Sequence, residues 1–152
     1  MSPGKRKGND MKATVLYYSH KGKTAFFARE IAMYLWSKGL DVSLSSISDF
    51  NAEKLSGSDF LISGCWTCGW FVIGQHPHKQ WRQSSKELSK MISPHRTLFF
   101  TTYRLCTGSM LYFMKRGMAI PASASVPFLK SKSGVLTPDD KKILDRLIAG
   151  QA

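Results

Sequence analysis

The feature that most constrains the fold is an alternation of short apolar runs with longer amphipathic segments along the chain. The short runs are rich in β-branched and aromatic residues, as strands are, whereas the longer segments repeat their apolar residues at helical spacing. Their order is strand, helix, strand, a loop or short helix, strand, helix, strand, helix, strand and helix. This alternation predicts an α/β fold in which helices cover both faces of a parallel sheet.

The predicted strands share alternating or continuous apolar residues and lie at residues 13–18, 41–47, 58–64, 97–102 and 124–129. The predicted helices share an apolar stripe and lie at residues 24–38, 79–91, 109–115 and from 137 onward. The last helix has the clearest start, because Thr137 can cap it, Pro138 suits its first position, and two acids follow in its first turn.

The size and composition of the chain indicate one folded domain. Its 152 residues fit a single domain, and a hydrophobic content of 43% is enough to bury a core. No apolar run reaches the ~18 residues of a membrane-spanning helix. Three cysteines are too few for a disulfide scaffold, and the N-terminus lacks the apolar stretch of a secretory signal. We therefore expect a cytoplasmic protein with a disordered basic tail at residues 1–12 and a domain at residues 13–152.

The net charge of +12 is unusual for a chain of this size. A positive field attracts nucleic acid, anionic lipid, acidic proteins or phosphorylated ligands. Lys79, Arg82, Lys86 and Lys90 recur at a spacing that places them on one helix face. Interleaved aromatic residues, which are typical of nucleic-acid platforms, are sparse there, so nucleic acid is disfavoured. A docking face for an acidic partner and a merely solvated helix face both stay open.

The loop after the first predicted strand has residues that suit a phosphate. It consists of Ser19, His20, Lys21, Gly22, Lys23 and Thr24. The loop stands before a helix N-terminus, where backbone N–H groups and the helix dipole favour an anion. Its last three residues match the end of a P-loop, but Tyr17 stands where that motif needs another glycine. A nucleoside triphosphatase is therefore not expected, and a plain strand-to-helix turn stays an alternative.

This loop resembles the phosphate loop of flavodoxins, which usually has the pattern Ser/Thr-x-Thr-Gly-x-Thr. Ser19, Gly22 and Thr24 stand at matching positions. Lys21 replaces the usual middle threonine and Lys23 the usual asparagine. In that family the loop binds the 5′-phosphate of FMN without a metal. The resemblance therefore implies FMN as the cofactor.

The segment after the third predicted strand resembles the first flavin-flanking loop of flavodoxins, often Gly-x-x-Thr-Trp-Gly. Gly64 precedes the residues that this resemblance implies as flavin-binding, which are Cys65, Trp66, Thr67, Cys68, Gly69 and Trp70. Cys68 takes the place of the ring-stacking tryptophan, so Trp66 or Trp70 is the candidate for that contact. Gly69 stands where a peptide of the family flips to donate a hydrogen bond to the flavin, and glycine tolerates both backbone states.

A third loop follows the fourth predicted strand, at the point of the family's second flavin-flanking loop. The residues implied here are Thr101, Thr102, Tyr103, Thr107 and Gly108. Tyr103 is the candidate for stacking on the ring. No single motif is complete, but three such loops occur in the right order between residue 13 and about residue 150.

The resemblance implies a three-layer, doubly wound, parallel five-stranded sheet of order 2-1-3-4-5. It also implies an FMN-binding electron-transfer protein that serves a redox partner protein. A small FMN-dependent NAD(P)H or quinone reductase and a flavodoxin-like module that has lost FMN are the alternatives. Because carriers of the family are typically acidic, the charge of +12 predicts an acidic partner here.

The Cys-x-x-Cys pair at Cys65 and Cys68 allows two other interpretations. Thiol–disulfide exchange needs a thiol at a helix N-terminus, and Pro77 and the intervening glycines disfavour a helix there. A zinc site of these two cysteines with His76 and His78 has the wrong spacing for a helix-borne histidine pair. No nucleophile with its base can be argued, so the sequence predicts neither a catalytic residue nor a metal.

Overall fold

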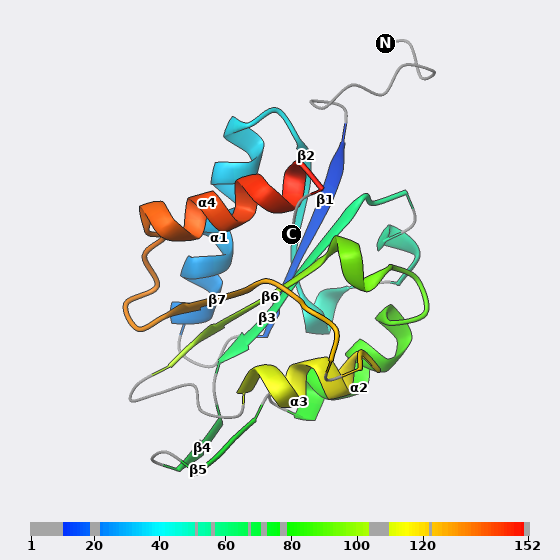
Figure 1. Ribbon diagram of the computed structural model, residues 1–152, viewed down its shortest axis with the longest axis vertical. Coiled ribbons are helices and arrows are strands. Elements are labelled where there is room, and N and C mark those ends of the chain that lie inside the picture. The colour runs from blue at the N-terminus through cyan, green and yellow to red at the C-terminus, as the bar shows by residue number, and fades with distance from the viewer. Residues whose placement is uncertain are drawn as a thin grey trace.

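The computed structural model describes residues 11–18, 22–50, 52–55, 57–66, 68–70, 73–76, 79–103, 110–121 and 123–150. Figure 1 shows a central twisted sheet with helices α1 and α4 on one face and helices α2 and α3 on the other. Within these ranges, no helix combines the length and the apolar character needed to cross a membrane.

The main sheet has five parallel strands, as predicted. They are β1 (Lys12–Tyr18), β2 (Asp41–Ser46), β3 (Phe60–Trp66), β6 (Thr97–Thr102) and β7 (Phe128–Ser131). Their order across the sheet is β2-β1-β3-β6-β7, which is the predicted 2-1-3-4-5 once the strands of a separate hairpin are left out. The chain therefore first builds outward to β2 and then returns past β1 to β3. This reversal creates a topological switch point beside β1.

Among the described residues, four α-helices cover the two faces of the sheet. They are α1 (Lys23–Ser37), α2 (Lys79–Leu88), α3 (Met110–Gly117) and α4 (Pro138–Ile148). Short 3-10 helices at Ile47–Asp49, Ala52–Leu55 and Pro94–Arg96 complete the connections. The predicted start of α4 is confirmed, because Thr137 and Asp140 form a reciprocal capping box.

Each face of the sheet has its own apolar cluster because successive strand residues point to opposite sides. The cluster beneath α1 and α4 includes Val15, Phe27, Ile31, Leu35, Ile62, Leu98, Phe100, Leu144 and Leu147. The cluster beneath α2 and α3 includes Leu16, Leu61, Trp81, Leu88, Phe99, Met110 and Met114. The three central strands β1, β3 and β6 are thus buried on both sides, which holds their carboxyl ends in place.

Some boundaries differ from the predictions. The third strand continues two residues beyond Gly64, and the last strand lies at Phe128–Ser131 rather than at residues 124–129. Its pairing with β6 starts only at Phe128, opposite Phe99, and continues into polar residues because β7 is an edge strand. Helix α2 ends at Leu88, three residues earlier than predicted.

Two residues of the predicted tail, Met11 and Lys12, are part of the described fold. Lys12 is the first residue of β1, and its N–H donates to the Asp59 carboxylate at 2.8 Å. Met11 packs against the core beneath α1, and its carbonyl accepts from Asp41 N–H at 2.9 Å. Residues 1–10, the rest of the predicted tail, lie outside the described residues.

Candidate functional site

The three predicted loops leave the sheet from one edge. Strand register places Tyr18 of β1 opposite Cys65 of β3, and Cys65 opposite Thr101 of β6. The carboxyl ends of β1, β3 and β6 therefore lie in a row, at the lower end of the sheet in Figure 1. In doubly wound sheets this edge is where ligands bind.

The first loop ends in a helix N-terminus that is suited to an anion. Gly22 has a φ of 90°, a left-handed conformation that glycine adopts without strain, and α1 begins at the next residue. The first turn of α1 contains no acid, so no carboxylate opposes an anion at the positive end of the helix dipole. A Cβ built on Gly22 meets no described atom within 4 Å, so the backbone can be approached from that side. Ser19, His20 and Lys21 lie outside the described residues.

Thr24 joins this first loop to the third. Its hydroxyl lies 2.6 Å from the hydroxyl of Thr102, and both residues are buried. In a pair of hydroxyls one oxygen accepts and the other donates, so the pair retains one O–H for a further acceptor. The structure therefore brings together two predicted site residues that are 78 positions apart in the chain.

The side chains of Cys65 and Thr101 point into the fold. Cys65 is fully buried within β3, and its thiol donates to the carbonyl of Trp66 at 3.2 Å. The Thr101 hydroxyl donates to the carbonyl of Cys65 at 2.6 Å. This bond links β3 to β6 at their carboxyl ends. Any contact of these two residues with a ligand would thus come from their backbone atoms rather than from the thiol or the hydroxyl.

A two-stranded hairpin follows β3, where the sequence predicted only a loop. Strands β4 (Cys68–Trp70) and β5 (Ile73–His76) pair antiparallel, with Cys68 opposite His76 and Trp70 opposite Ile73. The hairpin projects beyond the edge of the main sheet (Figure 1). It was missed because its strands are only three and four residues long, their register shifts, and glycines interrupt them. Thr67 lies outside the described residues.

This hairpin bears on the two other interpretations of the Cys-x-x-Cys pair. Cys65 is in β3 and Cys68 is in β4, so neither stands at a helix N-terminus, where a thiol pKa would be lowered. In the part of the chain that the structure describes, no three His, Cys, Asp or Glu residues are grouped as a metal ion needs. His78 lies outside that part.

The third loop starts at Tyr103, which is half-buried. Its backbone N–H donates to the carbonyl of Ser131 at 3.2 Å, which holds it beside the end of β7. Trp66, at the end of β3, is likewise half-buried. Thr107 and Gly108 lie outside the described residues.

A fourth segment borders the site and was missed by sequence reasoning. After β7 the Ser131 hydroxyl accepts from Gly134 N–H at 2.7 Å, which closes a tight turn. Gly134 has a φ of 87°, and a Cβ there would lie 3.3 Å from the side chain and the carbonyl of Lys23. The turn therefore packs against the start of α1. Its sequence signal was the Ser-Gly pair at residues 133 and 134.

Gly64 has a packing role in this structure. A Cβ built on it would lie 2.3–2.4 Å from three ring atoms of Phe100 on β6. Only glycine lets that ring lie flat against β3. Gly64, which matches the flavodoxin pattern, is thus required for the packing of β3 against Phe100 of β6.

Comparison with known proteins gives a consistent class. No protein-family model matches the chain. The flavodoxin of Clostridium beijerinckii is 30% identical over 89 residues, which are 59% of this chain and 62% of that protein. The match thus spans less than two thirds of this relative's length.

Solved flavodoxins have the same fold over nearly the whole chain. The solution structure of two-electron reduced Megasphaera elsdenii flavodoxin superposes with a TM-score of 0.72 at 19% identity, covering 92% of this chain and 99% of that one. Oxidised Flavodoxin 2 from Bacillus cereus gives a TM-score of 0.65 at 18% identity, covering 92% and 97%. The fold and the position of its site define the doubly wound, flavodoxin-like class of α/β proteins. This chain thus has a flavodoxin-like fold, as the resemblance of its loops implied.

Proposed function

We propose that this chain binds FMN at the carboxyl edge of its sheet and transfers electrons. The observation that carries the proposal is the N-terminus of α1. This helix begins directly after the left-handed Gly22, in the connection that follows β1. Its donors fit a phosphate: backbone N–H groups, the Thr24–Thr102 hydroxyl pair and the adjacent Lys23, with no acid in the first turn. Resemblance to flavodoxins in fold and sequence supports FMN as the owner of that phosphate.

The proposed assignment follows the three loops. Residues 19–24 hold the phosphate, residues 65–70 flank one side of the ring, and residues 101–103 with Thr107 and Gly108 flank the other. FMN supplies the redox chemistry when it is bound, and the chain supplies binding, orientation and exclusion of water. Because β1, β3 and β6 are buried on both faces, the loops that would hold FMN start from strand ends that are fixed by packing.

The partner in this proposal is a redox protein with an acidic docking surface. The net charge of +12 supports this choice, because opposite charges speed encounter and like charges oppose it. Transfer should therefore slow as salt rises. The proposed location is the cytoplasm, which the low cysteine content and the resemblance to flavodoxins support.

The first experiment is an FMN titration of the purified protein. We expect flavin absorbance bands in the loaded protein and quenching of FMN fluorescence on addition of apoprotein. A protein that stays colourless and quenches no fluorescence would overturn the proposal. Rapid oxidation of NAD(P)H by the loaded protein alone would instead indicate a reductase.

A pair of glycine variants tests the phosphate site itself. Gly22 and Gly57 have φ values of 90° and 83°, and neither has an atom within 4 Å of a Cβ built on it. Gly22→Ala and Gly57→Ala should therefore cost similar stability, about 1 kcal/mol. Only Gly22 lies at the carboxyl edge, since Gly57 precedes β3. We expect Gly22→Ala to weaken FMN binding about tenfold through a displaced phosphate contact. An equal effect of both variants would place the phosphate elsewhere.

A further inference from the structure

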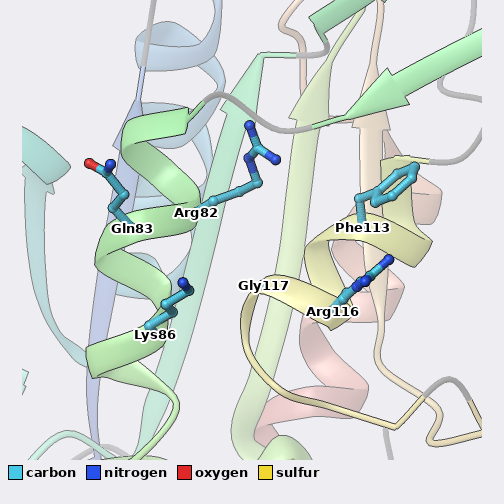
Figure 2. A pocket seen from close by; sticks show the side chains of 6 residues that line it. All are labelled: Arg82, Gln83, Lys86, Phe113, Arg116 and Gly117. Atoms are coloured by element: carbon cyan, nitrogen blue, oxygen red, sulfur yellow. The ribbon is translucent and has the colours of Figure 1, made fainter.

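A basic groove of about 500 Å³ lies between α2 and α3, outside the proposed FMN site. It is lined by Arg82, Gln83, Lys86, Phe113, Arg116 and Gly117. Figure 2 shows Arg82 and Lys86 projecting from α2 on the side of α3, and Phe113 and Arg116 projecting from α3. No acid is among the described residues that line the groove. It therefore combines three exposed cations with one half-buried aromatic ring.

The cation at Arg82 is unfavourable for helix α2 itself. Arg82 and Lys86 are four residues apart on one helix face, where like charges repel. Arg82 also lies at the end of the first turn, which holds no acid and where the helix dipole disfavours a cation. Lys86, in the last turn of α2, and Arg116, in the last turn of α3, both suit the dipole, whereas helix stability gives no reason for a cation at Arg82. Arg82 thus points to a role outside the helix.

The groove is held rigidly by the residues beneath it. Trp81 is fully buried, and its indole N–H donates to the Ser63 hydroxyl of β3 at 2.9 Å. A Cβ built on Gly117 would lie 3.0 Å from the Trp81 ring and 3.9 Å from Cγ of Arg82. Glycine at 117 therefore lets α3 approach α2 closely and places its backbone beside the Arg82 stem. The spacing between the two helices that carry the cations is thus fixed before any partner binds.

The groove also adjoins the carboxyl edge of the sheet. Helix α2 follows β5 in the chain, and α3 packs against both α2 and β5. The hairpin that holds β5 projects from that same edge (Figure 1). A molecule seated between α2 and α3 would therefore lie next to the loops proposed to surround the flavin ring.

We propose that this groove docks an acidic helical segment of the redox partner, an inference that rests on the proposed electron-transfer function. Arg82 and Lys86 are separated by about 6 Å along the axis, which is also the spacing of carboxylates at i and i+4 on a second helix. Arg116 engages that segment from α3, with Phe113 as an apolar floor. Docking in this groove brings the partner beside the flavin. Electron transfer requires that proximity, whereas binding of a nucleic acid does not.

Two triple variants test the proposal with equal loss of charge. The groove triple is Arg82→Gln, Lys86→Gln and Arg116→Gln. The control triple, on α1 and α4 across the sheet, is Arg29→Gln, Lys142→Gln and Arg146→Gln. All six side chains are exposed, so both triples should keep the melting temperature of the unaltered protein.

The first measurement is fluorescence anisotropy with a labelled helical peptide of about 20 residues that carries Glu at i and i+4. We expect the groove triple to weaken binding about tenfold and the control triple less than about twofold. A peptide with Gln in place of Glu should not bind. Equal losses in both triples would overturn the proposal, as would tighter groove-dependent binding of a labelled DNA duplex.

The second measurement is electron transfer from the reduced, FMN-loaded protein to an acidic iron–sulfur protein, followed by stopped flow at low and high salt. The groove triple should slow transfer about tenfold at low salt and leave the high-salt rate unchanged. Equal rates in the two triples would overturn the groove while electron transfer stands. If the chain binds no FMN, the proposed function fails, and the peptide measurement still decides whether the groove binds acidic segments.

Discussion

The hydroxyl pair of Thr24 and Thr102 should couple the α1 N-terminus to β6 energetically. The perturbation is replacement of each threonine by valine, singly and together, because valine has nearly the same shape and no hydroxyl. The two oxygens lie 2.6 Å apart in residues that are 1% and 3% exposed. Each single variant leaves one buried hydroxyl without this partner, which costs about 1–3 kcal/mol.

The double variant removes both hydroxyls, so it should cost less than the sum of the single variants. The expected coupling energy is about 1–2 kcal/mol, well above the ~0.5 kcal/mol within which independent sites add. The assay is urea unfolding of the apoprotein, with all four proteins at one pH. In a domain of this size the single variants should also melt about 2–12 °C lower. Additive free energies of unfolding would refute the reasoning, because they would mean that the hydroxyls do not interact.

Three further outcomes follow from particular contacts. Gly64→Ala forces a Cβ to within 2.4 Å of the Phe100 ring and should lower the free energy of unfolding in urea by about 3 kcal/mol. The added substitution Phe100→Leu should recover part of this loss. An unchanged free energy of unfolding for Gly64→Ala would contradict the packing. Burial and the hydrogen bond that its hydroxyl donates to Asp145 raise the pKa of Tyr34, so its neutral form stabilises the fold below about pH 10 and that stability is lost as pH rises. The stability advantage of the unaltered protein over Tyr34→Phe should thus shrink as pH rises above about pH 10, whereas a difference in urea midpoint that stays constant through that rise would contradict this link. Thr137→Ala removes the cap of α4 and should lower the free energy of unfolding by about 1 kcal/mol, unlike Thr137→Ser.

The sequence predicted the architecture because the core is periodic. The strand at Thr97–Thr102 and the start of α4 lie where the residues indicated, since six buried residues in succession and a Thr-Pro cap are local signals. The strand order also agreed, although it came from the resemblance of three loops rather than from periodicity. The hairpin of β4 and β5 had no such signal. Its strands are too short to show a period.

The site was predicted as segments, not as side-chain directions. The carboxyl ends of β1, β3 and β6, from which the three loops start, lie at one edge as expected, because parallel strands end together. Which way each side chain points depends on where a strand ends. Since β3 continues two residues past Gly64, the thiol of Cys65 turns into the core instead of the loop.

The sequence by itself determined the α/β class, the parallel sheet, the three candidate loops and the strong positive charge. All of these follow from local patterns or from composition. Only the tertiary structure decided the rest: the hydroxyl pair that joins Thr24 to Thr102, the Gly134 turn beside Lys23, and the groove in which Arg82 and Lys86 meet Arg116. Each of these joins segments that are distant in the chain, and their separation is set by how helices pack on the sheet. No local sequence pattern encodes the distance between such segments.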